Sequence, residues 1–405
     1  MNDGKMKKNN TIFVFASVLL FAAYTFACGF LFYMQAARAE GQFYESDLPA
    51  HLAMARDGWG YSLTAVIYRF FMRFPAYEVW IAAFLALFAG GTMVITYFAL
   101  RRYTFNRWSA LGAAAAVNIV MPCFVRAVHY ERYVGYQSPS VWHNSTYTVM
   151  KCLALLTLVF YLRFARRYKQ RVNWKDWILF TVFLTLSTAA KTSFLIVFAP
   201  VAFVGLFFDL YRRVPLKRVL LFSSAILPSA LIVILQEAVL FGKDTGNGIA
   251  IDFGYTLYLR AEKPYLTMLL SALFPVLVFL FNIGSVFKET ARDLKKRCFP
   301  RHTPFFFAWS MWAVGALELM FLKETGGREL DGNFLWGYSL CLFVLFIVSI
   351  VYFMNNLRSA RFLKGSYFGH MLYALFVGVV LGYHMYCGFY FFMRLLEGVT
   401  YFMQG

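Results

Sequence analysis

The chain has 405 residues, of which 60% are hydrophobic and only 15% are charged. Soluble globular domains carry roughly 25% charged residues, so this composition excludes a water-soluble enzyme or binding module. The apolar residues fall in runs of about 18–25, the length that crosses a bilayer as an α-helix. We therefore predict an all-α, polytopic transmembrane bundle that forms one integral membrane domain over residues 1–405.

The net charge of +19 comes from 39 Lys and Arg residues against 20 Asp and Glu residues. Most of the basic residues lie in short loops between apolar runs, where they orient a membrane protein and contact anionic headgroups. No basic stripe lies on a soluble domain, so we exclude nucleic acid as a partner and expect membrane lipid instead. The six cysteines have neither the spacing of a metal site nor that of a disulfide framework.

The apolar runs predict about eleven membrane-spanning segments. In chain order they are 11–34, 77–100, 108–125, 148–163, 176–187, 193–208, 218–236, 265–286, 304–323, 335–354 and 367–392. Alternate loops rich in Lys and Arg are cytoplasmic by the positive-inside rule. The N-terminus is then cytoplasmic and the C-terminus lies outside. The outer loops are 35–76, 126–147, 188–192, 237–264 and 324–334.

Two segments depart from a simple span. Ala37-Arg38-Ala39 fits a signal-peptide cleavage site, but the preceding apolar run of about 23 residues exceeds the 7–15 of a signal peptide. We therefore expect an uncleaved first span. The short spans 176–187 and 193–208 flank residues 187–193, which predicts a broken or re-entrant helix, tolerated where protein or water satisfies the backbone.

The first outer loop, residues 35–76, places Glu45, Asp47 and His51 within seven positions. Ionisable groups beside a bilayer cost free energy, so such a cluster predicts a functional task. Ser46 or Asp47 can cap a helix with Pro49 in its first turn, which puts Asp47 and His51 on one helix face. The alternative is that Asp47 only caps the helix and that Glu45 is a solvated loop residue.

A second part of this loop, residues 61–74, is amphipathic and places Arg69 and Arg73 among aromatic residues. This pattern is typical of a helix that lies in the membrane interface.

The order of these features resembles the GT-C glycosyltransferases: a first span, an acidic residue at the start of a long outer loop with interfacial helices, then about ten more spans. The resemblance implies transfer of a sugar from a polyprenyl-phosphate donor to an acceptor on the non-cytoplasmic face. It also implies that the first-loop acid is the catalytic base or lies next to it. Asp47 is the matching position and Glu45 the second candidate. At residue level the likeness covers 44–58, without the WWD-type segment of oligosaccharyltransferases.

Elementary chemistry agrees with this resemblance. Transfer from a lipid phosphate needs a base for the acceptor hydroxyl and cations near the leaving phosphate. We predict Asp47, Glu45 and His51 as catalytic residues. The Glu45-x-Asp47 pair also offers oxygen ligands to a divalent metal such as Mg²⁺ or Mn²⁺.

The other outer loops supply candidate ligands for the sugar and the donor phosphate. These are His129, Arg132 and His143 in loop 126–147, Lys191 in the helix break, Arg260 in loop 237–264, and Arg328 in loop 324–334.

Each of these candidates has an alternative. Loop 126–147 could be an aromatic belt in which Asn144 or Ser145 caps the next span. The ammonium of Lys191 needs an anionic partner, either a phosphate or a neighbouring carboxylate. Arg328 can grip a phosphate in bidentate fashion or pair with the acidic residues of its own loop, Glu324, Glu329 and Asp331. Glycines around Lys243 and Asp244 favour a mobile loop that could close over the donor, and an ordinary surface loop is the alternative.

No nucleotide-binding motif is present, which favours a lipid-linked donor. We expect a bacterial cytoplasmic membrane protein of cell envelope polysaccharide synthesis, with its active site outside and a saccharide, lipid or protein acceptor. A polysaccharide polymerase or ligase would share that donor, but its function is commonly concentrated in one large late loop. A transporter or flippase would carry ionisable residues deep within its spans and a repeat that relates its halves.

Overall fold

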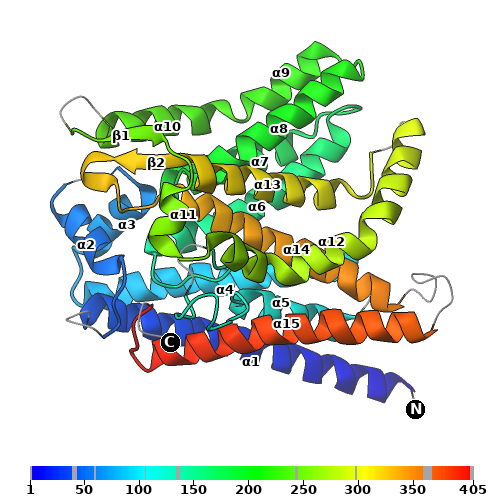
Figure 1. Cartoon of the computed structure of the whole chain (residues 1–405), viewed down its shortest axis with the longest axis horizontal. Helices are drawn as coiled ribbons and strands as arrows, with labels where there is room; N and C mark the ends of the chain where they lie inside the picture. Colours follow the sequence, from blue (N-terminus) through cyan, green and yellow to red (C-terminus); the bar gives the residue numbers. More distant parts are fainter. Residues whose placement is uncertain are drawn as a thin grey trace.

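The computed structural model describes residues 2–38, 43–58, 61–104, 106–133, 137–241, 245–296, 299–358 and 367–401. Within them the chain forms fifteen α-helices and one two-stranded sheet. Most of the long helices run roughly along the longest axis of the molecule (Figure 1). The all-α prediction is therefore confirmed. Ala39 of the cleavage motif and the loop residues Lys243 and Asp244 lie outside the described residues.

The elements follow one another along the chain as follows. The first half contains α1 (Asn2–Ala37), α2 (Leu48–Arg56), α3 (Leu63–Phe71), α4 (Tyr77–Tyr103), α5 (Arg107–Ile119), α6 (Ser145–Arg167), α7 (Trp174–Ala190) and α8 (Ser193–Tyr211). The second half contains α9 (Leu216–Ser224), α10 (Leu227–Leu240), β1 (Gly248–Ile251), α11 (Tyr255–Arg260), α12 (Pro264–Lys295), α13 (Thr303–Phe321), β2 (Leu322–Thr325), the 3-10 turn η1 (Gly326–Arg328), α14 (Leu335–Arg358) and α15 (Tyr367–Leu396).

Eight helices in the described residues are long and apolar enough to cross a bilayer: α1 from Asn9, α4, α6, α8, α12, α13, α14 and α15 from Phe368. The α9–α10 pair, bent by 43°, would be a ninth span. α5 and α7 coincide with predicted segments but have 13 and 17 residues, fewer than the about 20 that a span needs. Membrane integration is thus supported, and the count of eleven spans stays a prediction.

The two ends of the long axis differ in what they carry (Figure 1). The helices α2 and α3, the antiparallel β1–β2 sheet and the C-terminus gather at one end, called here the α2–α3 end. The N-terminus lies at the opposite end, with the connection from α12 to α13. All the predicted outer loops that the structure describes thus meet at the α2–α3 end.

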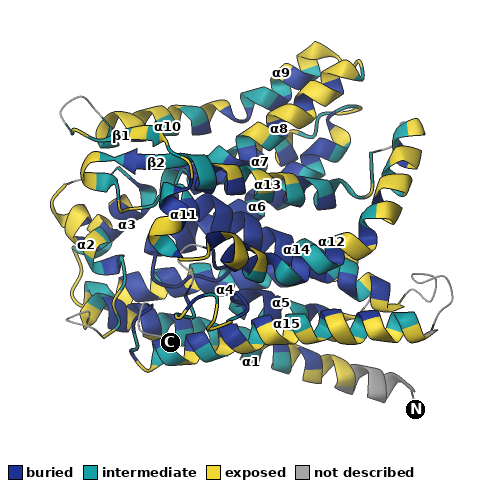
Figure 2. Ribbon diagram, in the orientation of Figure 1, coloured by how far each residue is buried: buried dark blue, intermediate teal, exposed yellow. Residues whose placement is uncertain are grey.

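The centre of the bundle is formed by α6 and α14, which are buried along much of their length (Figure 2). Tyr147 of α6 and Trp336 of α14 are fully buried, and their ring centroids lie 5.3 Å apart. The N-terminal ends of α6 and α14 are therefore held rigidly, and both ends face the α2–α3 end of the molecule.

The first outer loop folds into two short helices, as predicted. α2 buries Leu48, Leu52 and Ala55. α3 begins at a cap in which the Oγ atom of Ser62 accepts a hydrogen bond from the Ala65 amide at 3.2 Å, and it buries Tyr68 completely. The loop is therefore a packed part of the fold that fixes the position of Asp47.

Gly388 of α15 lies directly against the C-terminal end of α5. A Cβ atom there would lie 1.4 Å from the carbonyl oxygen of Ile119 at the end of α5. We expect Gly388→Ala to force α15 off α5 and to lower the melting temperature in detergent or to abolish folding. Gly382→Ala is the matched control, because a Cβ on Gly382 of the same helix meets nothing within 4 Å. Equal melting temperatures for the two variants would contradict this packing.

Sidedness is tested by single cysteines introduced into a variant that lacks the native ones. Glu45 at the α2–α3 end and Lys217 of α9 are both exposed. Because the basic loops are expected to be cytoplasmic, an impermeant thiol reagent should label Glu45→Cys, but not Lys217→Cys, in intact cells. Labelling of both positions from outside would refute the predicted orientation.

Candidate functional site

The carboxylate of Asp47 does not cap α2. Asp47 occupies the N-cap position, but its side chain makes no capping hydrogen bond. The Leu48 amide donates to the Oγ atom of Ser46 at 3.3 Å instead. The Oδ2 atom of Asp47 accepts a hydrogen bond from the Nδ2 atom of Asn144 at 2.6 Å, and its backbone amide donates to the His143 carbonyl at 3.1 Å. Asp47 is thus bound to the segment that precedes α6.

Asn144 is oriented by its second task. It is the N-cap of α6, and its Oδ1 atom accepts from the Tyr147 amide and from the Thr146 hydroxyl, both at 2.8 Å. Two donors on Oδ1 identify the other amide atom as Nδ2, the donor to Asp47. In the part of the chain that the structure describes, the Oδ1 atom of Asp47 accepts no hydrogen bond, so one oxygen can receive a proton.

Lys191 lies in the predicted break between α7 and α8. Its Nζ atom donates to the Oδ1 atom of Asn333 at 3.1 Å and lies 5.3 Å from the ring centroid of Trp336. The direct partner of Lys191 is therefore a neutral amide. Asn333 in turn donates a hydrogen bond to the Glu324 carboxylate at 2.9 Å, so Lys191 is connected to a carboxylate through Asn333. Burial lowers the pKa of Lys191 to about 8, while Asp47 and then Glu324 act in the opposite direction.

Arg328 pairs with acidic residues of its own loop. Its Nε atom lies 3.1 Å from Oε1 of Glu324, and another of its guanidinium nitrogens lies 3.0 Å from Oδ2 of Asp331. The geometry therefore agrees with the alternative of an intra-loop partner, although Glu329 approaches Lys323 instead. Glu324, whose side chain is almost fully buried, joins Arg328 to Asn333 and so to Lys191.

Two imidazoles complete the cluster, and burial favours the neutral form of both. The Nδ1 atom of His51 is 2.8 Å from the Ser145 hydroxyl, and the His143 ring lies 4.1 Å from that of Tyr401. Burial lowers the pKa of His51 to about 4 and also lowers that of His143, and in each case Asp47 opposes the shift. The Nδ1 atom of His143 is buried without a partner among the described residues, which is rare in folded proteins.

Arg260, at the end of α11, also belongs to this cluster. It donates to the Leu330 carbonyl at 2.6 Å, and its charge contributes to the lowered pKa of His143. The structure thus brings together Asp47, His51, His143, Lys191, Arg260 and Arg328. These residues and their partners Asn144, Asn333 and Glu324 are called here the Asp47 cluster.

Three predicted residues lie outside this cluster. The Glu45 side chain is exposed and makes no hydrogen bond or ion pair within the described residues. Arg132 stacks between Phe124 and Tyr390, 4.4 and 4.1 Å from their ring centroids. His129 is buried beside Tyr130, and burial lowers its pKa. None of the three has a recorded contact with Asp47.

Sequence reasoning missed the roles of two amides and one carboxylate. The sequence predicts the cap formed by Asn144 and the pairing of Glu324 with Arg328, but not the link from Asn144 to Asp47 or that from Glu324 to Asn333. Asn333 gave no signal of its own. For Asn144, the signal in the sequence was its position next to the candidate ligand His143 in loop 126–147.

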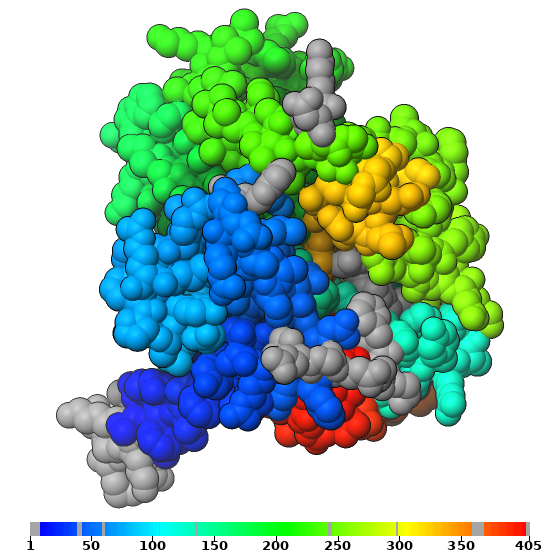
Figure 3. Space-filling model, turned by 90° about the vertical axis from the view of Figure 1, so that its left-hand side faces the viewer, coloured from blue at the N-terminus to red at the C-terminus, as the bar shows by residue number. Residues whose placement is uncertain are grey.

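The cluster lies at the α2–α3 end, which faces the viewer in Figure 3. There the surface is hollowed between the blue α2–α3 segment and the orange segment around β2. In the described residues, no three or more His, Cys, Asp or Glu side chains are placed to hold a metal ion. An octahedral Mg²⁺ needs more ligands than Glu45 and Asp47 supply, so a divalent metal stays a sequence-based prediction.

Comparison with known proteins does not assign the chain to a family. No protein-family model matches the chain, and no curated protein matches it either.

The coupling between Asp47 and Lys191 is testable without an activity assay. Competitive amine labelling read by mass spectrometry should give Lys191 a pKa of about 8. Because the Asp47 charge favours the ammonium, Asp47→Asn should lower that pKa further. Glu45→Gln removes an equal charge two positions away and should leave it unchanged. An effect of Glu45→Gln as large as that of Asp47→Asn would contradict the described cluster.

Proposed function

We propose that this protein is a GT-C-type membrane glycosyltransferase, which moves a sugar from a polyprenyl-phosphate donor to an acceptor hydroxyl on the non-cytoplasmic face. One observation carries the proposal. The Asp47 carboxylate does not cap its helix but is held through one oxygen by Asn144, with two neutral imidazoles and an ammonium in electrostatic contact. A half-buried carboxylate held in this way suits a base that acts on a hydroxyl.

In the proposed reaction the acceptor oxygen attacks the anomeric carbon of the donor sugar. The bond between that carbon and the phosphate oxygen breaks, and its electron pair leaves with the polyprenyl phosphate. The acceptor proton passes to Oδ1 of Asp47, the oxygen that accepts no hydrogen bond from the described residues. Asn144 holds the other oxygen, so the carboxylate needs little reorganisation as the proton moves.

Cations stabilise the charge that develops on the leaving phosphate. Lys191 suits this role because its Nζ atom is held by a neutral amide, and it remains mostly protonated at pH 7 with a pKa of about 8. Arg260 adds a second positive charge on the His143 side of the cluster. Arg328 is largely neutralised by Glu324 and Asp331, so we assign it a positioning role, exerted on Lys191 through Glu324 and Asn333.

Neutral histidines suit recognition of an uncharged sugar. At pH 7 an imidazole offers both a donor and an acceptor nitrogen to hydroxyl groups. The buried Nδ1 atom of His143, which has no partner in the described chain, is the clearest unsatisfied group in the cluster. A sugar hydroxyl that reached it would complete its hydrogen bonding.

A flippase for lipid-linked saccharides is the second candidate, and two buried side chains favour it. Lys151 lies within α6, with its Nζ atom bonded to the Pro139 carbonyl at 3.2 Å, and Glu318 is buried within α13. Ionisable groups inside spans often mark transport paths. Transport would leave the donor intact, whereas transfer releases polyprenyl phosphate, so the product separates the two functions.

Asp47→Asn tests the proposed base, because it keeps the shape and the contact with Asn144 while it removes the basicity. We expect sugar transfer to fall by roughly 10²–10⁴-fold, with membrane insertion unchanged. The assay uses purified protein in nanodiscs and polyprenyl-phosphate sugars, with release of polyprenyl phosphate as the readout. Glu45→Gln is the matched control and should retain near-normal turnover, because Glu45 is exposed.

The reverse result, with Asp47→Asn active and Glu45→Gln inactive, would move the base to Glu45. Normal turnover by both variants would overturn the proposed mechanism. Donor translocation across proteoliposomes without release of polyprenyl phosphate would favour the flippase.

A further inference from the structure

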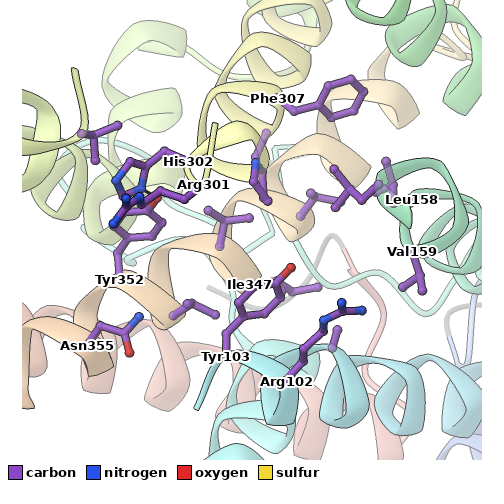
Figure 4. A pocket seen from close by; sticks show the side chains of 18 of the residues that line it. Arg102, Tyr103, Leu158, Val159, Arg301, His302, Phe307, Ile347, Tyr352 and Asn355 are labelled. Atoms are coloured by element: carbon purple, nitrogen blue, oxygen red, sulfur yellow. Dashed lines mark hydrogen bonds between the residues drawn. The ribbon is translucent and has the colours of Figure 1, made fainter. Parts of the chain in front are cut away.

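A large cavity lies away from the Asp47 cluster. It has a volume of about 1340 Å³ and is walled by α4, α6, α12, α14 and the start of α13 (Figure 4). Small-molecule pockets measure about 300–1,000 Å³. Along α14 the wall runs from Val344 to Asn356, about 18 Å at 1.5 Å per residue. That length is close to one leaflet of a hydrocarbon core about 30 Å thick.

Beyond its charged residues, the wall of this cavity is apolar. Leu158 and Val159 of α6, Phe307 of α13 and Ile347 of α14 line it (Figure 4). Phe98 of α4 and Leu280 of α12 line it as well, and they are 65% and 62% exposed. Water against such a surface is unfavourable. Within a membrane-spanning bundle, hydrocarbon chains are therefore the expected filling.

The cavity has a basic rim at the end away from Asp47. Arg102 in the last turn of α4 and Arg166 in the last turn of α6 both line it. Neither has a carboxylate partner in the described part of the chain, and Arg166 lies 5.8 Å from the Phe299 ring centroid. Figure 4 shows Arg102 beside Tyr103 at the edge of the cavity. Among the described residues, the two guanidinium groups of the rim thus have no protein counter-charge.

The other charged residues of the lining are already paired. Arg163 is 3.0 Å from Asp176, and Arg301 is 3.1 Å from Asp293. Glu289 is shared between Arg301 at 3.5 Å and His302 at 3.2 Å. The unbalanced charge at the rim is therefore positive and belongs to Arg102 and Arg166.

We propose that this cavity binds an anionic glycerophospholipid from the leaflet at the N-terminal end of the molecule. Its phosphate lies between Arg102 and Arg166, and its acyl chains extend along the apolar wall towards mid-membrane. Guanidinium groups suit this role because their planar donors match phosphate oxygens. The bound lipid would fill the space between α4 and α12, which both line the cavity. This site does not depend on the glycosyl transfer proposed above.

Native mass spectrometry of the whole purified protein tests the site, with phosphatidylglycerol titrated against phosphatidylcholine. We expect preferential retention of phosphatidylglycerol. The double variant Arg102→Gln/Arg166→Gln should weaken that retention about tenfold or more, because each lost contact is a charge-assisted hydrogen bond. The double variant Arg101→Gln/Arg167→Gln removes the same charge from neighbouring positions outside the lining and should retain the lipid.

A third variant tests the acyl-chain wall without a change of charge. Ile347→Trp fills part of the cavity, so phosphatidylglycerol retention should fall although both arginines remain. This variant keeps the test decisive if the arginine variant does not fold. Equal retention of the two lipids by the unaltered chain, or equal losses in the two double variants, would overturn the proposal. Co-purification of polyprenyl phosphate in this cavity, displaced by neither phospholipid, would also overturn it.

Discussion

The arrangement of the candidate site depends on one side-chain amide. Asn144 caps α6 through its Oδ1 atom and holds the Asp47 carboxylate through its Nδ2 atom. α6 is central and buried, so the cap is as rigid as the bundle itself. The first outer loop is thereby attached to the core at the position where its acidic residue lies. A carboxylate used for capping α2 would have faced its own helix and lost this contact.

The balance of charge around Asp47 follows from the same attachment. Arg328, Lys191 and Arg260 oppose Glu324, Asp331 and Asp47, and burial favours the neutral form of the two histidines because it lowers their pKa values. A nearly neutral set of paired groups is tolerable beside a bilayer, whereas isolated charges there are expensive. The same pairing restricts which cations remain available to a phosphate, and it favours Lys191 over Arg328.

The molecule presents different chemistry at its two ends. The α2–α3 end gathers loops and ionisable groups over a hollow surface (Figure 3), whereas the opposite half holds an apolar cavity with a basic rim (Figure 4). Central helices α6 and α14 connect them, since both begin beside the Asp47 cluster and end beside the cavity.

The sequence by itself determined the helical segments, because a span requires a long apolar run whose backbone hydrogen bonds are satisfied internally. It also predicted the helix that carries Asp47 and the break at Lys191. It ranked Asp47 ahead of Glu45 as the candidate base, but it did not identify the partners of Asp47, Lys191 and Arg328. Those partners needed the tertiary structure, because contacts such as Asp47 with Asn144 and Lys191 with Asn333 join residues 97 and 142 positions apart. The spacing of residues along the chain predicts which side chains share a helix face. Which side chains that face contacts depends on how helices distant in the sequence pack together.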